Sequence, residues 1–262
     1  MMQRFTIVSA AMLVFVLAAC SSSPKPKKKV VPPPPPPTQV VVLGTIHGQH
    51  RTSELYGTAQ LSEMIRQLRP TRVLCEIPPD RFMVALDEFE RTGTVTEARV
   101  SQFPEYVDVL FPLTKEMDFD IIPCAAWTQA MSDERAAALA RLRTERPEDS
   151  ATVQEAQQQA ERRIAAGGDP NDPRWIHTRP YDDIVRAGMT PYAALFDVDL
   201  GAGGWTAINE AHWALLSAAL DDAKDTGERV VIMFGAWHKY WILDRLHERP
   251  DVLVIDPIRF MP

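Results

Sequence analysis

The sequence predicts an α/β fold, a single domain with a largely parallel central sheet flanked by helices. Short apolar runs rich in β-branched residues alternate with longer stretches of helical periodicity along residues 40–262. The runs at 40–44 and 229–235 are almost continuously apolar, which is typical of strands buried on both faces. Because strands alternate with helices, successive strands are expected to run parallel and to be joined by helical crossovers.

The predicted elements have clear ends in the sequence. The apolar spacing from Leu61 to Leu68 predicts a helix that ends before Pro70, and Gly93 ends the helix that follows the second strand. The complete pattern predicts strands over residues 40–44, 72–76, 120–124, 229–235 and 251–255. It also predicts helices over residues 104–117, 206–224 and 239–248.

A polar helical excursion, about residues 132–166, interrupts this alternation. The segment is rich in Ala, Arg, Glu and Gln and contains few large apolar side chains. Pro147 is expected to divide it into two helices. We interpret the excursion as a solvated pair of surface helices, and a lid over a binding site is the alternative.

The first 39 residues are predicted to target and anchor the protein. Residues 1–19 combine a charged start, a short apolar run and small residues, the pattern of a signal peptide. Leu17–Cys20 resembles a bacterial lipobox, which implies cleavage before Cys20, acylation of Cys20 and attachment to a membrane. Ser21 after the cysteine implies a lipid-anchored place in the cell envelope, at the outer membrane. Residues 20–39 contain lysines and six consecutive prolines, typical of a semi-rigid spacer.

Charge excludes one class of partner. The chain has a formal net charge of -7, but five of its 28 basic residues and none of its 35 acidic residues lie before residue 40. Residues 40–262 therefore carry a net charge of -12, so we expect no nucleic-acid partner, and any polyanion would need a local basic pocket.

Two strands end in the same motif. The first strand leads into Gly44–His47 and a late strand leads into Gly235–His238, each with glycine followed three residues later by histidine. The second strand ends with Glu76. In a parallel sheet the carboxyl ends of the strands lie along one edge, where ligands bind, so these side chains are expected to converge.

Two kinds of chemistry suit His47, Glu76 and His238. Two imidazoles and one carboxylate can hold a divalent metal ion that keeps open positions for water. The same groups can also act without a metal, with Glu76 orienting a histidine that activates water. The sequence leaves both possibilities open.

The order and spacing of these residues resemble the TraB/PrgY/GumN–TIKI superfamily, which is related to the erythromycin-esterase and ChaN-like proteins. The resemblance rests on Gly44–His47, on Glu76 with Arg81 five residues later, and on Gly235–His238. It implies an α/β fold with a central cleft, and activities that range from metal-dependent proteolysis and ester hydrolysis to pheromone shut-down and haem binding.

The resemblance also implies roles for individual residues. His47, Glu76 and His238 would act in catalysis as metal ligands or water activators, and Arg81 would position a small-molecule or peptide substrate. We therefore expect a hydrolase that cleaves an ester or peptide bond with a divalent metal ion. The alternative is a non-catalytic lipoprotein of the same fold that binds a ligand such as haem, or a regulatory one. Ile208 stands where many members have arginine, which keeps that alternative open.

The remaining polar residues have weaker assignments. His50, Asn209 and Tyr240 are candidates for supporting positions around the motif histidines. His212 lies on an apolar helical stripe, and we interpret it as a core histidine whose hydrogen bonds are satisfied. We expect His177 to be exposed to solvent.

Overall fold

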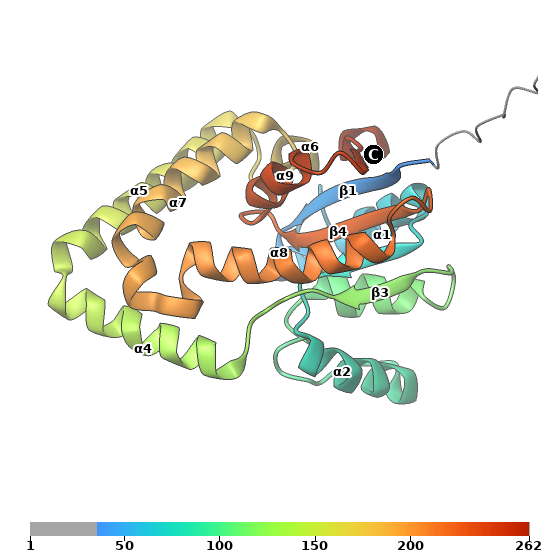
Figure 1. Ribbon diagram of the computed structural model, residues 1–262, viewed down its shortest axis with the longest axis horizontal. Coiled ribbons are helices and arrows are strands. Elements are labelled where there is room, and N and C mark those ends of the chain that lie inside the picture. The colour runs from blue at the N-terminus through green and yellow to red at the C-terminus, as the bar shows by residue number, and fades with distance from the viewer. Residues whose placement is uncertain (1–35, 262) are drawn as a thin grey trace, which may run out of the picture. The chain divides into compact units, whose positions relative to one another are not determined.

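Five parallel strands form one sheet at the centre of the protein. The computed structural model describes residues 36–261, and the strand order is β3-β2-β4-β1-β5 (Figure 1). Every neighbouring pair is parallel, so the predicted α/β class and parallel sheet are confirmed. The strands are β1 (Thr38–Thr45), β2 (Arg72–Cys75), β3 (Asp120–Pro123), β4 (Arg229–Gly235) and β5 (Val252–Val254).

The predicted signal peptide, Cys20 and most of the predicted linker lie outside the described residues. The linker was expected to reach residue 39, but β1 already begins at Thr38, where the side-chain hydroxyl donates a hydrogen bond to the carbonyl of Ala223. Within residues 36–261, no helix has the length and apolarity needed to cross a membrane.

Both faces of the sheet are buried, which explains the continuous apolar runs. Alternate residues of a strand point to opposite faces, and Val41 and Leu43 pack in a different core cluster from Val40 and Val42. The first cluster includes residues of α1 (Thr58–Leu68), and the second includes residues of α8 (Trp205–Asp222) and α9 (Lys239–His247). The sheet is therefore held between helical layers.

The remaining helices depart from the predicted bounds mainly in the middle of the chain. In place of one helix over 104–117, a π-helical turn η2 (Glu105–Leu110) continues into the short α3 (Phe111–Leu113). The others are α2 (Pro79–Thr92), α4 (Gln129–Glu145), α5 (Pro147–Gly167), α6 (Pro173–Ile176) and α7 (Arg179–Leu200).

The polar excursion forms α4 and α5, divided at Pro147 as expected. It is more than a solvated helix pair, because α5 packs along α7 and buries Val153, Ala160 and Ile164. In Figure 1 these three helices extend away from the sheet as one arm. Close packing within the arm depends on Gly188 of α7, since a Cβ there would lie 2.7 Å from the Cβ of Ala160.

The prediction that His177 is exposed is wrong. His177 is buried, its Nε2 accepts a hydrogen bond from the backbone N–H of Gly44 at 2.9 Å, and its Nδ1–H donates to the carbonyl of Pro173. The ring thus joins the end of β1 to α6. Burial, reinforced by the charge of Lys239, lowers the pKa of His177 from 6.5 to about 3.

Replacing His177 by glutamine should reduce the acid sensitivity of the fold. Below pH 6.5 the unfolded chain takes up a proton on His177, whereas the folded protein does so only near pH 3, so stability falls as the pH drops through this window. From pH 7 to pH 5 this group alone costs about 2 kcal/mol. Urea unfolding at both pH values should therefore show a loss about 2 kcal/mol smaller for His177→Gln than for the wild type. Equal losses would contradict the assignment.

Candidate functional site

The three predicted motifs meet at one edge of the sheet. Thr45 pairs with Gly235 and Cys75 pairs with Met233, so β1, β2 and β4 end at nearly the same level. β4 lies between β1 and β2, and it places the Gly235–His238 turn next to both partners. The expected convergence of the strand ends is confirmed.

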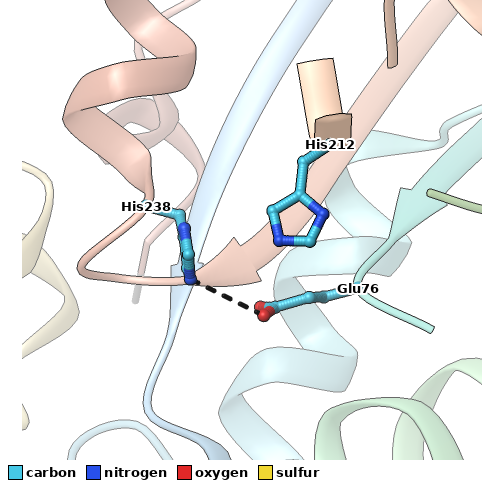
Figure 2. Close-up of side chains that lie close together, drawn as sticks. All are labelled: Glu76, His212 and His238. Carbon is cyan, nitrogen blue, oxygen red and sulfur yellow. Dashed lines mark ion pairs between the residues drawn. The ribbon is translucent and has the colours of Figure 1, made fainter. Parts of the chain in front are cut away.

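Glu76, His212 and His238 form the tightest cluster of potential ligands. One ligand atom of each lies within 4.8 Å of the other two, and His238 Nε2 is 3.8 Å from Glu76 Oε1. Figure 2 shows the three side chains pointing toward one another from the end of β2, from α8 and from the start of α9. These three residues could hold a metal ion.

Hydrogen bonds fix the orientation of two members of this cluster. Glu76 Oε2 accepts the N–H of Gly235 at 2.8 Å, which ties the carboxylate to the end of β4. Nδ1–H of His238 donates to Oδ1 of Asn209 at 2.7 Å, and the Asn209 amide is held by the carbonyl of Trp205. The Trp205 ring stacks on His238 with ring centroids 4.7 Å apart. His238 therefore presents an unprotonated Nε2 toward Glu76.

His212 was expected to be a satisfied core histidine, and only half of that interpretation is right. It is buried, and its Nδ1 accepts the N–H of Ala126 at 2.9 Å, but its buried Nε2 has no hydrogen-bond partner among residues 36–261. Neutral His212 therefore carries its proton on Nε2, on the side of Glu76 and His238. A buried N–H without an acceptor costs free energy.

His47 lies beside this cluster rather than in it. It begins a 3-10 turn with a positive φ of 49°, and its Nδ1–H donates to Oε1 of the fully buried Glu105 at 2.7 Å. Its Nε2 points to Gly235, where a Cβ would lie 2.5 Å from Nε2 and 3.4 Å from Oε2 of Glu76. Only glycine permits this approach, which accounts for the glycine of the second motif.

Burial and nearby charges shift the pKa values of these side chains in different directions. Burial raises the pKa of Glu76, although His47 and the Gly235 N–H oppose this. Burial also lowers the pKa of His212 to about 4 and that of His238 far below its usual value. Burial alone would lower the pKa of His47, but the hydrogen bond to Glu105 and the charges of Glu76 and Glu105 raise it overall. His47 is the histidine of the site that most readily holds a proton.

Two cavities open on either side of His47. One, of about 420 Å³, is lined by His47, His238, Trp237 and residues of α5 and of the loop after it. The other, of about 280 Å³, is lined by His47, Glu76, Trp127 and residues of α4. The helical arm therefore forms part of the wall of both cavities.

The other predicted residues lie around the site in different ways. His50 is buried with both nitrogens bonded, to the Tyr56 carbonyl and to the Ile46 N–H, so it holds the loop that carries His47. The Tyr240 hydroxyl accepts a hydrogen bond from Trp205 and supports the ring that stacks on His238. Arg81 pairs with Asp80 on α2 and lines neither cavity.

Several contributors carried no motif in the sequence. Glu105 belongs to the π-helical turn, and Arg99 and Arg135 line the smaller cavity from a loop and from α4. The signal for His212 was its spacing from Asn209, because residues three apart share one face of a helix.

Comparison with known proteins adds no relative: no family model, no curated protein and no solved structure matches the chain.

Gly235→Ala should disturb the site where Gly48→Ala does not. The new Cβ would lie too close to the His47 ring, so either His47 leaves Glu105 or the end of β4 shifts, at a cost of about 1–3 kcal/mol. A Cβ at Gly48, one residue after His47, meets nothing within 4 Å. Urea unfolding of both variants measures the difference, and equal midpoints would refute the steric argument.

Proposed function

We propose that this protein is a hydrolase that cleaves an ester or peptide bond, with a divalent metal ion held by Glu76, His212 and His238. The observation that carries the proposal is the cluster of Glu76, His212 and His238, whose ligand atoms lie within 4.8 Å of one another beside a cavity that Glu76 lines. Next to this cluster, His47 and Glu105 form a hydrogen-bonded acid–base pair.

The donor set fits a divalent ion such as Zn²⁺. Two imidazoles and one carboxylate are common ligands of catalytic zinc, which keeps further positions open. His238 donates its Nδ1–H to Asn209, as is usual for a histidine that binds a metal, whereas Nδ1 of His212 accepts the N–H of Ala126. Binding through Nε2 of His212 would require its proton to move to Nδ1, and the hydrogen bond from the Ala126 N–H would then be given up.

His47 is placed to move the proton of the attacking water. Its Nδ1–H is held by Glu105, which leaves the Nε2 lone pair facing the space beside Gly235 and Glu76. His47 would accept a proton from water there and pass it to the leaving group, while Glu105 stabilises the charged ring. A bound divalent ion supplies positive charge and lowers the pKa of a coordinated water to about 7.

This assignment changes the role expected for one residue and leaves another without a role. The sequence suggested His47 as a metal ligand, whereas the distances favour His212 in that position and His47 as the acid–base residue. Arg81 forms an ion pair with Asp80 and lines neither cavity, so we assign it no role in this proposal. We also propose that the protein lies in the cell envelope, anchored to the outer membrane through Cys20, as the lipobox resemblance implies.

Metal analysis tests the ligand set. Purified protein should bind one equivalent of Zn²⁺, and Glu76→Gln, His212→Ala and His238→Ala should each lower the affinity at least about 100-fold. His47→Ala should retain the metal, because His47 lies outside the cluster of three. The matched control is His247→Ala, which alters an exposed histidine on α9.

Two outcomes would correct the proposal. Loss of the metal from His47→Ala with retention by His212→Ala would assign the ion to the two motif histidines and Glu76. Absence of metal from the wild type would leave only hydrolysis without a metal ion.

Removing the charge of Glu105 should impair catalysis without loss of metal. Glu105→Gln leaves His47 without its anionic partner, so the rate of ester hydrolysis should fall at least about 100-fold. The rate is measured with p-nitrophenyl acetate and with short peptides. Glu116→Gln alters an exposed carboxylate that pairs with Arg66 and serves as the control. An unchanged rate in Glu105→Gln would exclude the acid–base role of the pair.

A further inference from the structure

We propose that the smaller cavity is a binding site for an oxyanion of the substrate, a carboxylate or a phosphate, recognised by Arg99 and Arg135. The inference rests on the proposed hydrolase, because Glu76 and His47 line the same cavity and the oxyanion would sit next to the bond that is cleaved. The oxyanion site specifies the class of substrate, namely a molecule that carries an anionic group on one side of the cleaved bond.

Arg99 is held in place but has no anionic partner. Its Nη2 donates to the carbonyl of Trp127 at 3.0 Å, while its Nη1 is buried without a hydrogen-bond partner among residues 36–261. The nearby Glu97 carboxylate is occupied by the backbone N–H groups of Arg99 and Val100. A buried guanidinium nitrogen that lacks a partner is costly, and an oxyanion in the cavity would satisfy it.

Arg135 approaches the same cavity from the helical arm. Its Nη2 donates to the Tyr192 hydroxyl at 2.9 Å, and its guanidinium lies 5.8 Å from the ring centroids of Trp127 and Tyr192. All of these partners are neutral. Within the described residues neither Arg99 nor Arg135 forms an ion pair, whereas Arg146, also near the arm, pairs with Asp149 and Asp199.

The two cavities differ in charge. The cavity with Arg99 and Arg135 contains one carboxylate, that of Glu76, which a bound metal ion would neutralise. The larger cavity, on the other side of His47, has no arginine or lysine in its lining and includes Glu161, Tyr181 and Trp237. An acidic protein disfavours anions on most of its surface, so two unpaired arginines provide the local basic pocket that an anionic substrate needs. The group on the other side of the cleaved bond would be uncharged.

Guanidinium groups recognise carboxylates and phosphates through paired N–H donors. Trp127 contributes a flat surface between the two parts of the site, because its ring also lies edge-on to His212 at a centroid distance of 6.3 Å. The oxyanion would therefore be fixed at a set distance from the groups that activate water, which orients the substrate for attack.

Calorimetric titration with matched probes tests the inference. Hippurate carries a carboxylate, hippuramide is its neutral amide, and phenyl phosphate presents the other oxyanion. The wild-type full chain should bind hippurate or phenyl phosphate at least about tenfold more tightly than hippuramide, and the tighter of the two identifies the group. Arg99→Gln and Arg135→Gln should each remove this preference and leave the affinity for hippuramide unchanged.

Control variants distinguish loss of the oxyanion site from unfolding and from binding of the probe to a metal ion. Arg143→Gln changes an exposed arginine two turns further along α4 and should bind as the wild type does. If Arg99→Gln unfolds because the Trp127 contact is lost, Arg135→Gln still decides the matter. His212→Ala should retain the preference for the anion; its loss there, with both glutamine variants unaffected, would show that an ion binds the probe and would overturn the inference.

The remaining outcomes are equally direct. Equal binding of hippuramide and the anionic probes, or no binding of either anion, also overturns the inference. Oxyanion selectivity that persists in a protein without metal or hydrolytic activity would refute the hydrolase and leave this site standing. Hydrolysis that proceeds at the wild-type rate in Arg99→Gln and Arg135→Gln would refute this oxyanion site and leave the hydrolase standing.

Discussion

The hydrogen-bonded register between β1 and β4 is the constraint on which the site depends. These strands are far apart in sequence, yet Thr45 lies opposite Gly235, so the turns that follow them leave the sheet side by side. A shift of one residue would turn the alternating side chains to the other face, against the helices that cover it. Burial of both faces therefore sets the register, and the register sets where His47 and His238 meet Glu76.

Buried polar groups around this edge are mostly paired, which makes the exceptions informative. His50, His177 and Asn209 each bond through both ends of the side chain and hold segments of backbone or another ring. In the described part of the chain, the side-chain atoms buried without a hydrogen-bond partner near this edge include Nε2 of His212, Nη1 of Arg99, Oε2 of Glu105 and Oγ1 of Thr45. Since such atoms cost free energy in an empty site, their positions outline where bound groups would sit.

The strands and the glycine–histidine motifs were predictable because their signals are local. A continuous apolar run indicates a strand buried on both faces, and parallel strands bring their carboxyl ends together. His212, Glu105 and Arg99 were missed as site residues because their positions depend on how α8, η2 and a loop pack against the sheet. His177 was misjudged for the same reason, since its burial comes from contacts with Gly44, more than 100 residues away. Arg81 has the expected spacing from Glu76, but it forms an ion pair with Asp80 and lines neither cavity.

The arm formed by α4, α5 and α7 lies apart from the elements that carry the proposed catalytic groups. The groups that would break a bond come mainly from strand ends and from α8, while walls of the two cavities come from the arm. Substitutions in α4 and α5 can therefore reshape what is admitted without moving the water-activating groups. Under the proposed function, such a division would let changes in one peripheral segment alter the substrate while the chemical step stays the same.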